Sequence, residues 1–204
     1  MKRTLFALAL VCLATAGFAE GWSAGLGASV SSFKYEIKSD EGGTLTGVPF
    51  NLVGYVESPY LQFAVGYRMI DGFHIKTSSG AEDVTWKFAY LSFAAFGKYP
   101  IQLGPITVFL TAGVEYDFML HGEDFDGTFS KQVRRDWNSL WIKAGVGAEV
   151  PITAVIYVRP EVLVGYQLNN QFDKNQIDDA KAQGADISIN TVELQVTVLV
   201  GVKL

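Results

Sequence analysis

Cysteine is nearly absent from this chain of 204 residues, and the single one, Cys12, lies near the start of the sequence. A protein processed beyond that position contains no thiol, which excludes disulfides and cysteine chemistry. Histidine is almost as rare, with only His74 and His121. Two imidazoles are a thin basis for a metal site, so we expect neither a metal nor a cofactor.

The chain also lacks an excess of basic residues and, after its first 19 residues, any long apolar run. Its 16 Lys and Arg residues are outnumbered by 21 Asp and Glu residues, which argues against a nucleic-acid partner. Hydrophobic residues nevertheless make up 49% of the sequence, so they must be dispersed along it. Dispersed apolar residues are typical of a transmembrane β-barrel and not of a helical membrane protein.

An export signal opens the sequence. Lys2 and Arg3 precede an apolar run over residues 5–16, and small residues occupy two of the last three positions before residue 20, as signal peptidase requires. The run is too short for a helical anchor, which needs about 20 residues. We predict cleavage after Ala19, and a lipid anchor on Cys12 is the alternative interpretation of this region.

The predicted mature protein, residues 20–204, is expected to be one domain, and its last residues alternate strictly. One face of that stretch carries Val192, Leu194, Val196, Val198, Val200, Val202 and Leu204. Seven further stretches alternate in the same way. Together with the export signal, this pattern predicts that the apolar faces contact lipid and the polar faces line a closed barrel. The predicted fold is therefore all-β, an eight-stranded antiparallel transmembrane up-and-down β-barrel.

The predicted strands cover residues 21–32, 48–57, 60–70, 84–99, 106–120, 137–150, 154–169 and 191–204. The connections alternate between short turns and long polar loops, as in outer-membrane barrels with periplasmic turns and extracellular loops. We therefore expect the outer membrane of a diderm bacterium, with four extracellular loops and both termini in the periplasm. The stretch 84–99 is apolar on both faces, so the sequence leaves open which of its residues face the lumen.

Several stretches resemble the small eight-stranded outer-membrane barrels of the OmpA-transmembrane, OmpX and OmpW type. The features that carry the resemblance are the signal peptide, the strand 109–116, the Gly-Val-Gly-Ala run at 145–148 and the terminal residues 200–204. The sequence departs from the family at Leu204, since these barrels usually end on an aromatic residue that the assembly machinery reads.

Charged residues recur at positions predicted to face the lumen. They are Arg68, Glu115, Lys143, Glu149, Arg159 and Glu161. If Val150 is opposite Ala154 across the turn between their strands, Lys143 lies directly opposite Glu161. One interpretation is an ion pathway or gate. We favour a packed polar plug, because an eight-stranded barrel is just wide enough for side chains to fill.

A second set of inward positions is apolar and lies nearer the loops. The pattern of the first strand changes phase at Phe33, and the set comprises Phe33, Tyr35, Met119, Trp137, Trp141 and Leu163. These residues either cap the plug or line a pocket for a small hydrophobic molecule, as the resemblance to OmpW-type barrels implies.

We do not expect an enzyme. Some barrels similar to this one modify lipid A through a histidine, a serine and an acidic residue, but His74 and His121 are both at loop positions. The favoured function is a structural or surface-interaction role with a plugged lumen, in which Phe125 and Phe129 would contact partners. The alternative is OmpW-like binding or passage of small hydrophobic molecules. Candidate partners are therefore outer-membrane lipid, host or other cell-surface molecules that meet the loops, and a small hydrophobic ligand.

Overall fold

The computed structural model describes residues 21–38, 43–77, 80–124, 127–169 and 188–204. The predicted signal peptide, its cleavage site and Cys12 lie outside these residues, as does Phe125. In the described part of the chain, no helix is both long and apolar enough to cross a membrane.

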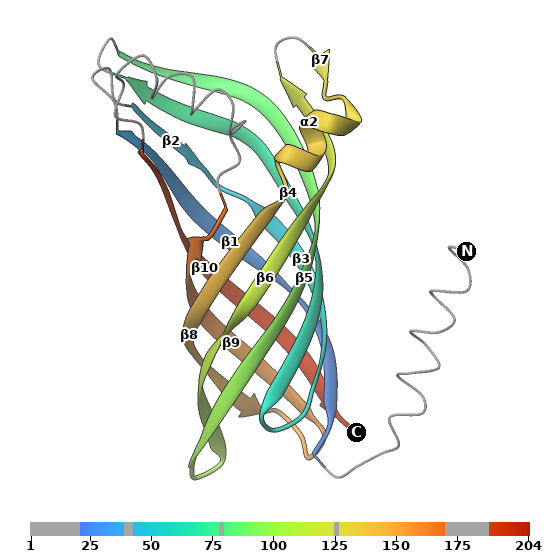
Figure 1. Cartoon of the computed structure of the whole chain (residues 1–204). Helices are drawn as coiled ribbons and strands as arrows, with labels where there is room; N and C mark the ends of the chain where they lie inside the picture. Colours follow the sequence, from blue (N-terminus) through green and yellow to red (C-terminus); the bar gives the residue numbers. More distant parts are fainter. Residues whose placement is uncertain (1–20, 39–42, 78–79, 125–126, 170–187) are drawn as a thin grey trace.

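Strands make up nearly all of the described chain. They are β1 (Ser23–Lys38), β2 (Gly43–Gly47), β3 (Phe50–Glu57), β4 (Leu61–Thr77), β5 (Gly80–Leu103), β6 (Ile106–Asp124), β7 (Gly127–Thr128), β8 (Ser139–Pro151), β9 (Ile156–Gln167) and β10 (Ser188–Lys203). The helix α2 (Lys131–Asp136) lies between β7 and β8. In Figure 1 the long strands run side by side around a common axis, with β7 and α2 at the end that we call upper.

The sheet closes on itself, because β10 pairs with β1 from Ser23↔Lys203 to Lys38↔Ser188. Every pairing is antiparallel, and β2 and β3 both lie between β1 and β4. These two strands are segments of one barrel strand that is interrupted before Phe50, where Pro49 has no amide hydrogen to donate. Because β7 pairs only with β6, the described chain is an eight-stranded closed barrel, as predicted.

The alternation predicted from the sequence also describes the two faces of the barrel. On β4 every second residue from Leu61 to Met69 is exposed. On β10 every second residue from Val192 to Val202 is exposed. The lumen side carries most of the buried polar and charged residues. A closed ring satisfies every strand edge, and an apolar exterior suits lipid, so the strands are those of a transmembrane barrel.

The structure also resolves β5, whose phase the sequence left open. Tyr90, Ser92 and Lys98 are buried, whereas Phe93 and Tyr99 are exposed. Even-numbered residues of this strand therefore face the lumen.

One predicted feature of the upper end is wrong. The polar loop expected over residues 71–83 is largely strand, since β4 continues to Thr77 and β5 starts at Gly80. The register shifts between Asp71 and Phe73, at a point where Gly72 has φ of 87°, which glycine adopts without strain. Beyond this shift Phe73 is buried and His74 is exposed. A stretch that looks polar in sequence thus still has one apolar face.

The inward direction predicted for Phe33 is confirmed. Ser29, Ser31 and Phe33 are all buried, and the exposed residues between them keep the alternation of β1 unbroken. What changes at Phe33 is the polarity of the inward face, which becomes apolar as the strand approaches the upper end.

The turn between β8 and β9 is longer than predicted. Val150 is opposite Val158 and not Ala154, because the amides of Ile152 and Thr153 both donate to the carbonyl oxygen of Ile156. This shift places Gly165 opposite Lys143 and Gly147 opposite Glu161. The predicted direct pair between Lys143 and Glu161 is therefore wrong.

Candidate functional site in the barrel lumen

Five charged side chains meet in the upper half of the lumen, and we call them the upper ion network: Arg68, Glu115, Asp117, Lys143 and Glu193. Arg68 contacts Glu115 at 2.7 Å, Asp117 at 3.0 Å and Glu193 at 3.3 Å. Lys143 Nζ lies 2.7 Å from Glu115 and 2.8 Å from Glu193. Since all five side chains are almost completely buried, each charge depends on its partners to offset lost hydration.

Neutral donors complete this network. Ser92 donates to Asp117 at 2.5 Å, and the Trp141 indole donates to the same carboxylate at 3.0 Å. Lys143 also donates to the side-chain oxygen of Gln195 at 2.7 Å. The hydrogen bond of Trp141 ties this residue to the charged layer, although its ring is largely apolar.

A second set, the lower ion network, lies toward the other end: Glu57, Lys98, Glu149, Arg159 and Glu161. Glu57 binds both Arg159 and Lys98, the latter at 2.8 Å. Lys98 also contacts Glu149 at 3.0 Å, and Arg159 lies 3.9 Å from Glu161. The Arg159 guanidinium stands 4.3 Å from the centre of the Tyr55 ring and 5.3 Å from that of Phe109, in the range of cation–π contacts.

Hydroxyl groups bind the remaining oxygen of Glu57. Tyr157 donates to it at 2.9 Å, Ser23 donates to it at 3.0 Å, and Tyr55 donates to Tyr157 at 2.8 Å. The side chains of Tyr55 and Tyr157 both pack against Gly201, where an added Cβ would lie 2.2 Å from the Tyr55 hydroxyl. A glycine at this position is therefore a packing requirement of the lower network.

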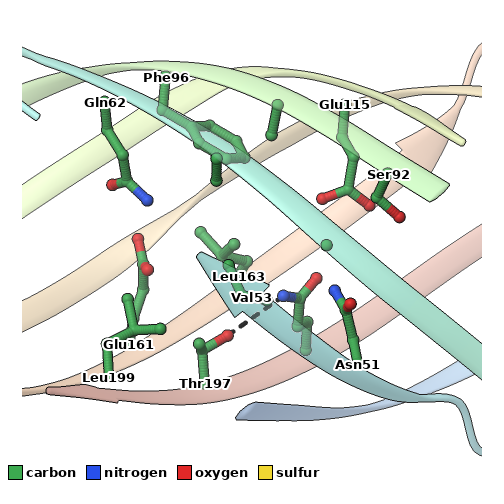
Figure 2. A pocket seen from close by; sticks show the side chains of 14 residues that line it. Asn51, Val53, Gln62, Ser92, Phe96, Glu115, Glu161, Leu163, Thr197 and Leu199 are labelled. Atoms are coloured by element: carbon green, nitrogen blue, oxygen red, sulfur yellow. Dashed lines mark hydrogen bonds between the residues drawn. The ribbon is translucent and has the colours of Figure 1, made fainter. Parts of the chain in front are cut away.

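A cavity of about 30 Å³ separates the two networks. Its lining comes from several strands and includes Asn51, Gln62, Glu115, Glu161 and Thr197. Figure 2 shows the side chains of Gln62 and Glu161 pointing toward one another from opposite walls of this cavity.

Apolar side chains close the upper end, and we call this cluster the apolar roof. Its buried members are Phe33, Ile70, Phe73, Val84, Phe88, Tyr90 and Met119, with Leu45, Ile75, Trp86, Phe129 and Trp137 packed against them. The Phe88 ring is central, with its centroid 5.2 Å from Phe73 and 5.1 Å from Trp137. Between the roof and the upper network lies a cavity of only about 20 Å³.

The lower end is much more open. A hollow of about 490 Å³, the lower mouth, is bordered by Glu57, Lys98 and Glu149 of the lower network and by Trp22 and Leu204 near the chain ends. Of the lower network, Glu149 is partly exposed to this mouth, whereas Glu57 and Lys98 border it with buried side chains.

The structure places the predicted charged residues in two layers and not in one. Arg68, Glu115 and Lys143 lie in the upper network, and Glu149, Arg159 and Glu161 lie in the lower one. Glu161 therefore contacts Arg159, while Lys143 contacts Glu115 and Glu193.

The predicted apolar set is also divided. Phe33, Met119 and Trp137 belong to the roof, and Trp141 lies just beneath it. Leu163 lines the cavity between the networks. The backbone of Tyr35 is part of β1, but its side chain lies outside the described residues. Phe129, predicted to contact partners, is partly buried and packs against the roof.

Four members of the two networks were not in the predicted set of lumen charges: Glu57, Lys98, Asp117 and Glu193. Asp117 and Glu193 alternate with outward apolar residues, so their inward direction was readable. Glu57 is the last residue of β3 and directly precedes the predicted turn at 58–59. Lys98 lies in the strand whose phase was open.

The two histidines considered for catalysis lie in strands and not in the predicted loops, His74 on β4 and His121 on β6. His74 lies 2.7 Å from Asp83, and His121 lies 3.7 Å from Glu123, all on the exposed surface. His121 faces outward because the register of β6 against β5 shifts near Ala89. Within the described ranges, no three His, Cys, Asp or Glu residues form a group that could hold a metal ion.

No protein family and no curated protein matches the sequence of this chain. Solved structures are nevertheless similar to it. Neisserial surface protein A has 14% identity and a TM-score of 0.49, over 89% of this chain and 99% of that one. The outer membrane protein OprG from Pseudomonas aeruginosa has 10% identity and a TM-score of 0.49, over 91% and 97%.

The attachment invasion locus protein Ail of Yersinia pestis, solved in complex with the heparin analogue sucrose octasulfate, has 12% identity and a TM-score of 0.38, over 91% of this chain and 100% of that one. These similarities span most of this chain and nearly the whole of each of the other three proteins.

Proposed function

We propose that this protein is an outer-membrane β-barrel with an occluded lumen, which acts at the cell surface through its upper end. The observation that carries this proposal is the filling of the lumen. Two ion networks and the apolar roof follow one another along the axis, and the cavities between them measure about 30 Å³ and 20 Å³. Each cavity has room for little more than a water molecule or two, so we infer that solutes do not pass.

The upper end supports a surface role. Outward residues of β4 are apolar up to Met69 and polar from Asp71, including His74 and Lys76. The strand therefore continues past the lipid-facing band, with a polar outer face and an apolar inner face that carries Phe73. Such an extension presents a rigid polar surface to the medium, supported from within by the roof.

The connections support the orientation. The connections at the lower end, 58–60, 104–105 and 152–155, are all short, and the longest connection, 168–187, joins β9 to β10 at the upper end, where β4 and β5 are joined by 78–79 alone. With periplasmic turns and extracellular loops, the described ends of the chain, Gly21 and Leu204, face the periplasm. The signal peptide over residues 1–19 is part of this proposal, because an outer-membrane protein must be exported.

Conductance in planar lipid bilayers tests the occlusion. The purified barrel should produce no stable ion current at neutral pH. The matched comparison is a double variant, Phe88→Ala with Trp137→Ala, which thins the roof while leaving both ion networks in place. Stable single-channel steps from the unaltered protein would refute an occluded lumen.

Cell adhesion tests the surface role. Bacteria that display the protein should bind cultured epithelial cells or one another more than the same strain without it. Replacing Lys76, Asp83 and Lys87 by serine should reduce this binding, since these exposed side chains lie on the outer face of the extension. Replacing Gln102, at the lower end of β5, is the control and should not change this binding. Equal adhesion with and without the protein would contradict the proposal.

The alternative, binding of a small hydrophobic molecule, is favoured by one observation. Trp137 and Trp141 both line the cavity under the roof. A ligand of more than a few atoms must displace roof side chains to enter about 20 Å³. A saturable change in tryptophan fluorescence with indole, alkanes or fatty acids, lost in Trp137→Phe, would establish this alternative.

A further inference from the structure

We propose that the lower mouth binds a short peptide with free ends, whose ammonium group contacts Glu149 and whose carboxylate contacts Lys203. The mouth measures about 490 Å³, within the roughly 300 to 1,000 Å³ of pockets that hold small molecules. Both charged residues line it, together with apolar side chains that include Trp22, Pro59 and Pro100. A hollow of this size with charges of both signs suits a ligand that also carries both.

Glu149 presents negative charge to the mouth. Lys98 donates to one of its oxygens at 3.0 Å, but the same ammonium group also donates to Glu57 at 2.8 Å. One lysine therefore serves two carboxylates. The Glu149 side chain is partly exposed and lines the mouth, so the ammonium group of a ligand can reach it and form a charge-assisted hydrogen bond.

Lys203 supplies the opposite charge. It is the last residue of β10, opposite Ser23 of β1, and it is exposed. Its backbone amide donates to the carbonyl oxygen of Val155, whereas no described residue pairs with its ammonium group. The carboxylate of a ligand therefore meets a donor that no side chain of the described barrel already occupies.

The separation of the two charges favours a peptide over a single amino acid. Glu149 lies on β8 and Lys203 on β10, with β9 between them. Neighbouring strands lie about 4.8 Å apart, so the backbones of β8 and β10 are roughly 10 Å apart across the sheet. The ammonium and carboxylate groups of an amino acid share one carbon atom, whereas three extended residues span about 10 Å. A tripeptide therefore connects the two charges.

The mouth lies at the end of the barrel where the chain end marked C is drawn in Figure 1, opposite β7 and α2. The site is therefore separate from the proposed surface role and from the pocket under the roof, and a bound peptide does not have to pass through the lumen. Only the location of the mouth in the periplasm rests on the proposed function.

Calorimetry on the purified protein in lipid nanodiscs tests the site, with the tripeptide alanyl-leucyl-alanine as the probe. The free peptide should give a saturable heat. N-acetylation or C-terminal amidation of the peptide should each weaken binding about fivefold, since each removes one ion pair. Glu149→Gln should weaken binding of the free peptide by the same factor and leave the affinity for the acetylated peptide unchanged. Lys203→Gln should behave in this way toward the amidated peptide.

The matched control is Glu123→Gln, because Glu123 is an exposed carboxylate on β6 outside the mouth. This change should leave all three affinities as they are. Equal heats for the free and the blocked peptides would overturn the proposal, as would the absence of any saturable heat at millimolar peptide. Binding that survives the combined replacement of Glu149 and Lys203 by glutamine would overturn it too.

Tryptophan fluorescence locates the peptide. A saturable change on addition of alanyl-leucyl-alanine should be lost in Trp22→Phe, because Trp22 lines the mouth, and retained in Trp137→Phe, because Trp137 lines the cavity under the roof. The reverse result would place the peptide at the upper end and overturn the assignment of the site to the lower mouth.

Discussion

The upper and lower ion networks contain the same groups, two cations and three carboxylates each, but different surroundings. The apolar roof covers the upper network, and the cavity beneath the roof measures about 20 Å³. The lower network borders a mouth of about 490 Å³. We expect this difference in surroundings to set how much each charge contributes to stability, because water from the mouth can take the place of a lost partner in the lower network, whereas the roof keeps water from the upper one.

The largest expected effect comes from removing a cation of the upper network. Lys143→Ala should lower the free energy of unfolding by about 3 to 5 kcal/mol, because Glu115 and Glu193 lose a buried partner. Lys98→Ala in the lower network should lower it by only about 1 to 3 kcal/mol, since water from the mouth can hydrate Glu57 and Glu149. Urea unfolding in lipid vesicles measures both values. Equal losses would remove the distinction between the networks.

The roof provides the next test, because it covers the upper network and leaves the lower one uncovered. Phe88→Ala should lower the free energy of unfolding by about 3 kcal/mol, as for other buried rings, since Phe88 packs against Phe73 and Trp137. In this background, Lys143→Ala should become less destabilising than in the unaltered protein, because water then reaches the upper network. An unchanged effect of Lys143→Ala would mean that the roof does not exclude water.

A double-mutant cycle examines which pairs act within one network. Lys143→Ala and Glu193→Ala together should destabilise the barrel less than the sum of the single changes, by about 1 to 3 kcal/mol, because the two side chains are 2.8 Å apart. Lys143→Ala and Glu161→Ala belong to different networks and should be additive within about 0.5 kcal/mol. Strong coupling of the second pair and none of the first would contradict the two-layer arrangement.

The smallest effect should come from replacing Glu149, the most accessible carboxylate of the two ion networks. The Glu149 side chain retains 18% exposure next to the lower mouth. Glu149→Gln should therefore change the free energy of unfolding by less than about 1 kcal/mol, as for solvent-accessible ion pairs. The same urea titration measures it, and a loss as large as that of Lys143→Ala would show that the lower network is as dry as the upper one.

Much of the fold was readable from the sequence, because alternation is a local property of the strand. Successive side chains point to opposite faces of the sheet, so Val196 and Val198 were assigned outward, and Arg68 and Glu115 inward, without knowledge of any partner. The closed eight-stranded barrel and its lipid-facing band followed from this pattern.

The inward residues of the upper end were harder to predict, because register shifts break the alternation. The shift between Asp71 and Phe73 turns an apparently polar loop into strand with an apolar inner face. The sequence pattern 71–83 has no regular period across this shift, so Phe73 and Val84 could not be assigned to the roof.

The partners inside the lumen were decided only by the tertiary structure. Arg68 on β4 meets Asp117 on β6 and Glu193 on β10, strands that are not paired with β4. Such contacts cross the barrel, and they depend on the register of every strand between them. A single turn, in which two amides bind the Ile156 carbonyl oxygen, shifted β9 enough to separate Glu161 from Lys143. The sequence therefore determined which residues face inward, whereas the accumulated register around the closed sheet determined which of them touch.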